Sequence, residues 1–515
     1  MKKTSLFAFL LVMPLIVACG GKKKEREPFS VPLVDVEHLT INLPTMPELD
    51  TTSAVRNDGT YDIIDLYQLS DMHAMIDYDA SKGYFGFSGL ANFIASKRQE
   101  NKGSILISSG DMWQGGAESN LTQGKIVAEA MRYVGFDCMT LGNHEFDWGK
   151  EVLSRNSNYF KDSMPLLAGN LQYKTDSTRP NFVQASKVIL RGGYKIGVIG
   201  TIGAIEYSIS KTVFDEFKLT SSYTFAQEEA SRLKTEEGCN LVVWSSHENT
   251  ELVNIPANVD IFFGGHEHKD FNLTKSNGSS ILVPAMATLN YGEDIAHVEV
   301  KMDPSTKGIV SAEGEIIKGS SSTSYFNDET NIKSIFDQYR LETDKVKKYE
   351  LNNVSGTFVK NQELANLSTK AMFDEFKDEN TVAAFQNGNG GVRNDIKEGK
   401  VTYGDIYTAF PFDNEIVKFE IKGSDIANFF EGSNVRNLNL YCPTKKLSEF
   451  DTSKTYTMIA TDYVCTNVLE LSEDKFTRFA GTVIRDCVAK YIYNNSNLNS
   501  ENFKSSLSDY SRPRY

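Results

Sequence analysis

Five polar clusters, rich in histidine and acidic residues, follow apolar runs within the first 300 residues of the chain. Five of the seven histidines of the chain lie in them. A histidine at the end of one strand is usually an ordinary surface or core residue, but five such clusters call for a common explanation. They are Ser70-Asp71-Met72-His73, Gly110-Asp111, Gly142-Asn143-His144-Glu145-Phe146-Asp147, Ser246-His247 and Gly265-His266-Glu267-His268.

The apolar runs alternate with helix-like stretches such as 124–133 and 225–236. This alternation predicts an α/β fold, with β-sheets flanked by helices. Functional groups in such folds gather on loops just past the strand ends, where the clusters lie. The runs are Ile63–Leu69, Ile105–Ser108, Lys195–Ile199, Leu241–Trp244, Ile261–Phe263 and Ile281–Val283.

The composition of the clusters predicts a metal site. Residues i and i+2 of an extended segment project the same way, so Asp71 with His73, or His266 with His268, could reach one ion. Imidazole combined with carboxylate and amide oxygens suits Zn, Mn or Fe. Asp111 follows a glycine and has two oxygens with which to bridge two ions. A lone Gly-Asp pair would indicate only a turn.

The order DxH, GDxxxG, GNHEFD, SH and GHxH resembles the calcineurin-like metallophosphoesterase superfamily. Residues 142–149 are similar to its bacterial 5′-nucleotidase branch, and the resemblance covers about 61–300. It implies two divalent metal ions that share one carboxylate. The implied ligands of the first ion are Asp71, His73, Asp111 and His268, and those of the second are Asp111, Asn143, His247 and His266.

The resemblance also implies that His144 faces the phosphate and that Asp147 orients its ring. As an imidazolium, His144 would stabilise charge that develops on phosphorus or on the leaving oxygen. The other two histidines, His38 and His297, lie outside the clusters and are predicted to be structural.

The second half of the chain resembles the 5′-nucleotidase C-terminal domain, which supplies substrate specificity. The motifs are 387–393 (NGNGGVR), 402–407 (TYGDIY) and 410–414 (FPFDN). The planar guanidinium of Arg393 suits an oxyanion. The resemblance implies that Phe412 stacks on a nucleobase, and Asn387 and Asn389 are further candidate substrate-binding residues.

Three departures from the family pattern bear on the substrate. Gly388 stands where relatives carry Asn, and Lys370 stands where Asp is usual. The Gly-Gly-Asp-Gly-Phe segment, which supplies the second aromatic of the base clamp, is missing after Tyr463. Phe412 could equally be a core residue.

These observations predict a 5′-nucleotidase that releases phosphate from nucleoside monophosphates. The alternatives are a 2′,3′-cyclic nucleotide phosphodiesterase, a nucleotide-sugar hydrolase or another phosphoesterase. A surface lipoprotein that only binds a ligand is a further alternative, but it should have lost some of the metal ligands. The formal charge of −14 argues against a partner that is a nucleic-acid polymer.

The N-terminus resembles a bacterial lipoprotein signal. Lys2 and Lys3 precede an apolar stretch too short to span a bilayer comfortably, and Cys19 follows it. The resemblance implies cleavage before Cys19, a lipid on its thiol and a place in the cell envelope, on the periplasmic or outer surface. The other five cysteines are expected to be buried. The expected divisions are a signal peptide (1–19), a tether of low order (20–58), a metallophosphoesterase domain (59–318), a linker with a helix (319–349) and a C-terminal substrate domain (350–515).

Overall fold

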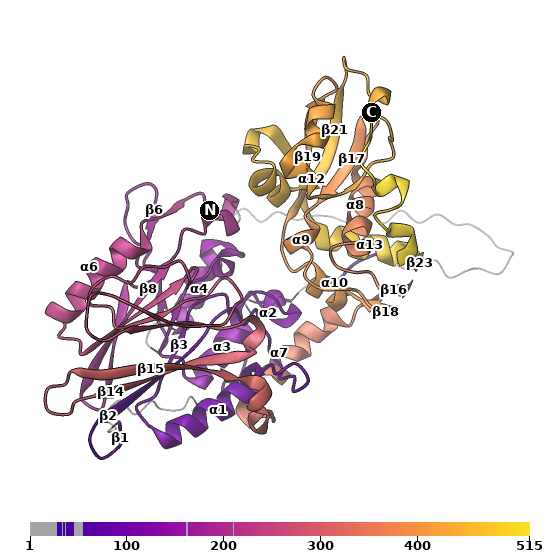
Figure 1. The fold of residues 1–515 in the computed structure, drawn as a ribbon. Coiled ribbons are helices and arrows are strands. Elements are labelled where there is room, and N and C mark those ends of the chain that lie inside the picture. Colours follow the sequence, from indigo (N-terminus) through magenta and orange to yellow (C-terminus); the bar gives the residue numbers. More distant parts are fainter. Residues whose placement is uncertain (1–27, 33, 37, 46–54, 161–162, 210) are drawn as a thin grey trace, which may run out of the picture.

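The computed structural model describes residues 28–32, 34–36, 38–45, 55–160, 163–209 and 211–515. They form two bodies, with helix α7 (Thr330–Lys347) between them (Figure 1). The expected signal peptide and Cys19 lie outside the described residues. Within the described chain, no helix has both the length and the apolar character needed to cross a bilayer.

The first body contains two β-sheets. One has seven strands in the order β15-β14-β2-β3-β4-β5, with β1 paired to β2. Its strands β2 to β5 are parallel, so their carboxyl ends share one edge. The strand bounds are β1 (Arg56–Asn57), β2 (Asp62–Leu69), β3 (Ile105–Ser108), β4 (Cys138–Thr140), β5 (Leu166–Leu167), β14 (Asp294–Met302) and β15 (Ile309–Lys318).

The second sheet has the order β12-β13-β11-β10-β8-β7. Here β8, β10, β11 and β13 are parallel. A separate pair joins β6 (Leu171–Tyr173) to β9 (Phe217–Leu219). The remaining bounds are β7 (Ser186–Arg191), β8 (Tyr194–Ile202), β10 (Leu241–His247), β11 (Ile261–Phe263), β12 (Phe271–Lys275) and β13 (Val283–Ala287).

Strand alternation divides the buried side chains between the layers. Ile64 and Leu66 of β2 pack against Val198 of the other sheet, while Tyr67 and Leu69 face the helices. Helix α6 covers the outer face of the second sheet. The helices are α1 (Gly86–Glu100), α2 (Ala117–Leu121), α3 (Lys125–Val134), α4 (Gly149–Phe160), α5 (Lys211–Phe214) and α6 (Ser222–Thr235). The expected layered α/β fold is confirmed.

The second body has a five-stranded sheet, in the order β20-β17-β21-β19-β22, and a three-stranded sheet, β18-β16-β23. The strands are β16 (Glu350–Ser355), β17 (Thr381–Gln386), β18 (Gly399–Thr402), β19 (Glu415–Lys422), β20 (Asn439–Tyr441), β21 (Thr455–Thr461), β22 (Phe476–Val483) and β23 (Leu498–Asn499). The helices are α8 (Glu363–Phe376), α9 (Gly388–Gly391), α10 (Tyr403–Ala409), α11 (Ile426–Glu431), α12 (Ser433–Arg436) and α13 (Ile484–Asn494). Helix α10 begins with a capping box between Thr402 and Asp405.

The segment between the expected signal peptide and the first strand is partly packed, unlike the predicted tether of low order. Phe29 and Val31 lie against the core of the second body, and Leu39 and Ile41 lie against that of the first. Gln338 of α7 exchanges hydrogen bonds with the backbone of Asn42. Both bodies and α7 therefore contact described residues between Phe29 and Asn42.

All five cysteines of the described chain are buried free thiols. Cys138 belongs to the core between the sheets, and Cys442 and Cys465 belong to a core of the second body. They occupy the places of small apolar side chains, as expected.

His297 makes partly buried polar contacts on β14, away from the strand-end clusters. Its Nε2 lies 2.8 Å from Asp65 Oδ1, its Nδ1 lies 2.8 Å from Glu315 Oε1, and its ring stacks on Tyr67. Burial disfavours the charged ring, but these two hydrogen bonds outweigh burial and raise the pKa of His297 above 6.5.

We expect His297→Gln to destabilise the fold in a pH-dependent way. A raised pKa gives stability that is complete below pH 6.5 and is lost as pH rises through the folded-state value. Burial raises the pKa of Asp65, but the His297 hydrogen bond and its other partners lower it overall, so Asp65 stays ionised at pH 5. The loss in free energy of unfolding should be about 2 kcal/mol at pH 5 and smaller at pH 9, measured by urea denaturation. His38→Gln, at an exposed ring, is the control, and an equal loss at both pH values would contradict this account.

Candidate two-metal site

The seven expected metal ligands converge at one edge of the two-sheet body. Asp71 and His73 follow β2, Asp111 follows β3 and Asn143 follows β4. His247 is the last residue of β10, and His266 and His268 follow β11. Because these strands are parallel within their sheets, their carboxyl ends bring the side chains together. Both sheets contribute donor atoms.

The donor atoms form overlapping groups. Asp71, His73 and His268 form one, and Asp111, His247 and His266 form another, with the donor atoms of each group within 4.8 Å of one another. A third group joins His73 and Asp111 to His144. Asn143 Oδ1 lies 3.0 Å from His266 Nδ1, which places the amide beside the second group. Asp111 therefore lies between two potential ion positions.

Hydrogen bonds fix the orientation of two histidines. The Nδ1–H of His73 donates to the carbonyl of Gln114, and that of His247 donates to the carbonyl of Ser109. Each ring therefore presents the lone pair of Nε2 to the site, which is the arrangement of metal-binding histidines. The Nε2 atoms of His73 and His268 face each other at 3.0 Å.

The residues present fit a pair of divalent ions. His247 Nε2 is buried, has no hydrogen-bond partner in the described chain and lies 3.3 Å from Asp111 Oδ2. Asp71 and Asp111 are 0% and 1% exposed, and charge buried in this way requires compensation. Burial lowers the pKa of His73 to about 3 and that of His266 to about 4, which keeps both rings neutral. At His247 burial also disfavours the charged ring, but the carboxylates, Asp111 first, raise its pKa to about 10. The site thus combines neutral imidazole donors with buried carboxylates whose negative charge a cation would balance.

The ligand loops have a constrained backbone. Five of the seven expected ligands have positive φ: Asp71 (53°), His73 (44°), Asp111 (54°), His266 (80°) and His268 (55°). They lie past the strand ends in left-handed conformations, so strand alternation does not bring them together. Gly142 is equally constrained, because a Cβ there would lie 2.2 Å from Asp111 Oδ1. Such strain persists only where the surrounding structure enforces it.

Glu145 supports two of these loops through hydrogen bonds. It was not predicted from the sequence as a site residue. Its buried carboxylate accepts hydrogen bonds from the backbone N–H groups of Asp111, Met112 and Gly142, at 2.8 to 2.9 Å. It therefore ties the loop after β3 to the loop after β4. Its place within the GNHEFD motif was the available signal.

His144 and Asp147 form a pair on the short helix η1 (His144–Phe146) and its end. Nδ1 of His144 lies 2.9 Å from Asp147 Oδ2, and the backbone N–H of His144 donates to Asp111 Oδ1. Burial disfavours the charged ring, but Asp147 and Asp111 together raise the pKa of His144 above its ordinary value. The ring is held at the edge of the expected metal centre.

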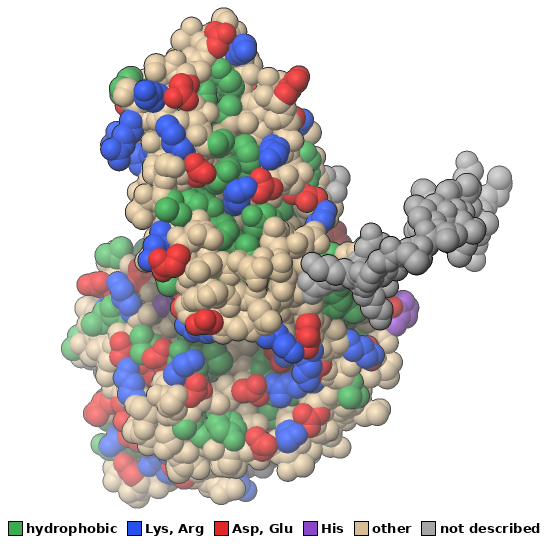
Figure 2. All heavy atoms as spheres, turned by 90° about the vertical axis from the view of Figure 1, so that its right-hand side faces the viewer, with side chains coloured by type: hydrophobic (Ala, Val, Ile, Leu, Met, Phe, Trp, Pro, Cys, Tyr) green, Lys and Arg blue, Asp and Glu red, His purple; other side chains and the backbone are tan. Residues whose placement is uncertain are grey.

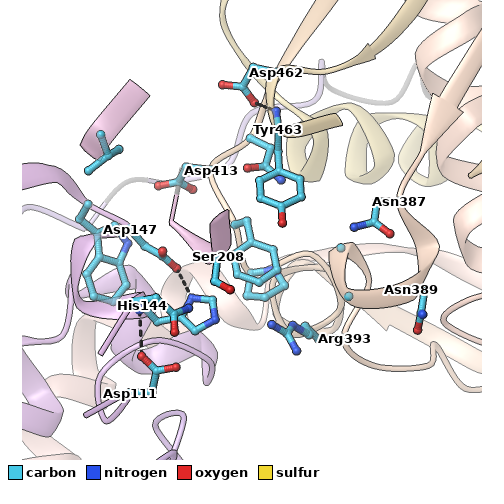
Figure 3. A pocket seen from close by; sticks show the side chains of 18 of the residues that line it. Asp111, His144, Asp147, Ser208, Asn387, Asn389, Arg393, Asp413, Asp462 and Tyr463 are labelled. Atoms are coloured by element: carbon cyan, nitrogen blue, oxygen red, sulfur yellow. Dashed lines mark hydrogen bonds and ion pairs between the residues drawn. The ribbon is translucent and has the colours of Figure 1, made fainter. Parts of the chain in front are cut away.

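A cavity of about 320 Å³ opens beside this pair and is lined by both bodies. The first body contributes Asp111, His144 and Asp147, and the second contributes Arg393 and Tyr463 (Figure 3). The structure thus brings the expected catalytic and substrate-binding residues to one cavity.

The expected substrate-binding residues differ in their surroundings. The Phe412 ring lies between His144, stacked at 5.6 Å, and the Arg393 guanidinium, at 5.2 Å. The side chain of Arg393 forms no ion pair with any described residue. Asn387 points toward Tyr463, whereas Asn389, which also lines the cavity, is exposed (Figure 3).

Tyr463 and Trp148 also line the cavity, and sequence reasoning assigned neither of them a role. Trp148 directly follows the motif that contains His144 and Asp147. Tyr463 directly precedes the position where the family segment with the second aromatic is missing. Only the folded arrangement shows that its ring enters the cavity.

Charge on the surface is mixed. On the face drawn in Figure 2, basic side chains are interspersed with acidic ones over both bodies. This face has no continuous basic stripe among its described residues.

Two family models match the chain. The calcineurin-like phosphoesterase model matches residues 64–270, and the 5′-nucleotidase C-terminal domain model matches residues 343–442. The first model covers all seven expected ligands, and the second covers Arg393 and Phe412.

Known proteins show the same relationship. A probable 5′-nucleotidase of Treponema pallidum is 24% identical over 67% of this chain and 69% of its own length. The endonuclease YhcR of Bacillus subtilis is 29% identical over 70% of this chain. The chain spans only 28 to 41% of the length of three curated relatives, this endonuclease (32%) among them.

A solved 5′-nucleotidase precursor of Thermus thermophilus has the same fold, with a TM-score of 0.67 at 19% identity, over 84% of this chain and 96% of that one. The donor set, the two matched domains and this fold agree. The chain thus has a calcineurin-like phosphoesterase domain followed by a 5′-nucleotidase C-terminal domain.

Proposed function

We propose that this protein is a metal-dependent phosphoester hydrolase that removes phosphate from nucleoside 5′-monophosphates. The observation that carries the proposal is the position of His144, between the donor groups around Asp111 and a cavity that contains Arg393. Relatives that match about two thirds of the chain are named as 5′-nucleotidase and as endonuclease, so the substrate is inferred from the cavity.

We assign one ion to Asp71, His73, Asp111 and His268, and the other to Asp111, Asn143, His247 and His266. When bound, two such ions lower the pKa of water and neutralise charge on the phosphoryl oxygens. Zn, Mn and Fe all suit this mixture of imidazole, carboxylate and amide donors.

Side chains of the protein provide proton donation and substrate binding. His144, held by Asp147, donates a hydrogen bond or a proton to the oxygen on which charge develops. Arg393 offers its planar guanidinium to phosphate or substrate oxygens. Phe412 and Tyr463 offer aromatic surface for a nucleobase, so Tyr463 could replace the second aromatic that the sequence lacks. Asn387 is near enough to contribute a polar contact, whereas the exposed Asn389 is a weaker candidate.

Two variants should distinguish the loss of bound metal from the loss of turnover alone. Asp111→Ala should lose bound metal and turnover together, because both ions depend on its carboxylate. His144→Ala should keep its metal but lose turnover by a factor of about 10² to 10⁴, as expected for a general acid. Elemental analysis after gel filtration and phosphate release from AMP with Mn, Zn or Co measure the two quantities.

Asp328→Ala, at an exposed carboxylate, is the control for Asp111→Ala and should change neither quantity. Full activity of Asp111→Ala would sink the metal assignment. Wild-type protein that turns over none of AMP, a 2′,3′-cyclic nucleotide, a UDP-sugar and an aryl phosphate would sink the proposed activity. A preference for one of the last three would replace the monophosphate as substrate.

Phe412→Ala should raise the KM for AMP about tenfold, because one stacked base contact is lost. Ribose 5-phosphate has no base, so its KM should change little. Phe412→Trp should retain AMP binding, since it keeps an aromatic face. An equal change for AMP and ribose 5-phosphate would instead assign Phe412 to the support of His144.

We also propose that the protein is lipid-anchored in the cell envelope, which rests on Cys19 and the apolar segment before it. Cys19→Ser should abolish incorporation of labelled palmitate and move the chain from the membrane to the soluble fraction. Cys239→Ser, at a buried cysteine, should leave both unchanged. Labelled lipid that persists in Cys19→Ser would refute the anchor.

A further inference from the structure

One covalent connection joins the two bodies after Val55. From that residue onward, the described chain passes from the first body to the second once, through α7. Ile335 and Phe336 of α7 pack in the core of the first body, whereas Val346, near its end, packs in the core of the second. A body that is joined at one point can pivot about it, so other contacts have to fix its orientation.

The direct interface between the bodies is not continuously packed. Two cavities, of about 320 and 560 Å³, are lined by residues of both bodies. Polar contacts cross the interface beside them: Asn120 donates to the carbonyl of Pro411 at 3.2 Å. Asn467 donates to the carbonyl of Ile209 at 3.3 Å. Because cavities bury little apolar surface, this interface contributes only modestly to holding the bodies in one orientation.

The N-terminal segment adds a second crossing between the bodies. We call its described residues from Phe29 to Asn42 the strap. Residues 29, 31, 34, 36, 39 and 41 are half-buried, and the other described residues between Phe29 and Asn42 are exposed. The spacing of two within 29–31, 34–36 and 39–41 is that of an extended chain with alternate side chains on one face. The strap therefore lies along the protein surface with one face against it.

The start of the strap is fixed to the second body. The ring of Phe29 lies 6.1 Å from that of Tyr349 and 5.6 Å from that of Tyr493, a residue of α13. Tyr349 directly precedes β16, so Phe29 contacts the point at which the chain enters the second body. Val31 and Val34 pack against the same core.

The end of the strap is fixed to the first body and to α7. Leu39 and Ile41 lie against the core of the first body. The ammonium of Lys125, the first residue of α3, donates to the carbonyl of Leu39 at 3.2 Å. Gln338 of α7 donates to the carbonyl of Asn42 at 3.1 Å and accepts from its N–H at 2.8 Å. Helices α3 and α13, near the two ends of the strap, belong to different bodies (Figure 1).

We propose that the strap holds the second body in the orientation that forms the cavity lined by His144 and Arg393. When either end of the strap is released, the second body can turn about the end of α7, and Arg393 and Phe412 then move away from His144. The expected metal ligands all belong to the first body, so this release changes substrate binding and leaves the ligands in place. The change in substrate binding rests on the proposed function, whereas the change in orientation does not.

The test measures the distance between the bodies with spin labels at Lys102→Cys and Lys454→Cys, which replace one exposed lysine on each body. The labels are carried by the full Cys19→Ser chain with Zn bound, because its own remaining five cysteines are buried. The distance distribution should be narrow in this chain. Phe29→Ala and Leu39→Ala should each broaden it, although the two residues contact different bodies.

The same two variants should raise the KM for AMP about threefold and keep their bound metal, because only the fraction with the closed orientation binds substrate well. Combining them should change neither quantity beyond the larger single effect, since a strap released at one end is already released. Phe29→Trp keeps an aromatic ring and should retain the narrow distribution. Leu43→Ala is the matched control, because Leu43 lies just past the strap and is 37% exposed, and it should change neither quantity.

A narrow distribution in both Phe29→Ala and Leu39→Ala would overturn the inference. Broadening in only one of them would overturn it as well, because that residue would then support its own body alone. Loss of bound metal in either variant would point to damage within the first body and would also count against the strap. Wild-type protein without turnover of AMP would overturn the proposed function, while the distance measurement would still decide on the strap.

Discussion

Two carboxylates buried beside each other, Asp71 and Asp111, set the main constraint on this structure. Removing an ionised carboxylate from water costs several kcal/mol unless opposite charge is close. The imidazoles of His73 and His266 are themselves held neutral by burial, so they supply electron pairs rather than charge. The two carboxylates are stable only with a cation close to them. This cation is either a proton on His247 or the metal ions that the donor atoms of the site suit.

This constraint explains why two sheets are needed. The first sheet supplies the carboxylates and Asn143, while the second supplies His247, His266 and His268. The packed apolar core between the sheets therefore fixes the distance between the two halves of the donor set. Positive φ at Asp111 and four other expected ligands costs on the order of 1–3 kcal/mol each. Glu145 helps to maintain these conformations, because its carboxylate accepts backbone N–H groups from both adjoining loops.

The sequence predicted the layered fold and the convergence of the ligands because both follow from local patterns. Apolar runs predicted β2, β3, β10 and β11, and the shared direction of their carboxyl ends predicted where the polar clusters meet. The reason given for Asp-x-His was wrong in detail, since left-handed turns rather than strand alternation aim Asp71 and His73. The position of Tyr463 could not be predicted, because it depends on how segments far apart in the chain pack. The contacts that Phe29 and Leu39 make with the two bodies likewise depend on tertiary packing.

Under the proposed function, specificity would arise at the interface between the two bodies. Asn120 of the first body donates to the carbonyl of Pro411, and Arg485 donates to Asp413 Oδ1 at 2.5 Å and to the carbonyl of Phe410. These contacts hold the loop on either side of Phe412 and place its ring on His144. A ring pair of this kind contributes only about 0.5–1.5 kcal/mol beyond its buried area, so a substrate can displace it at modest cost. Under the proposed function, the Phe412 ring that now covers the His144 imidazole can exchange that contact for one with the substrate, which would couple recognition by the second body to chemistry in the first.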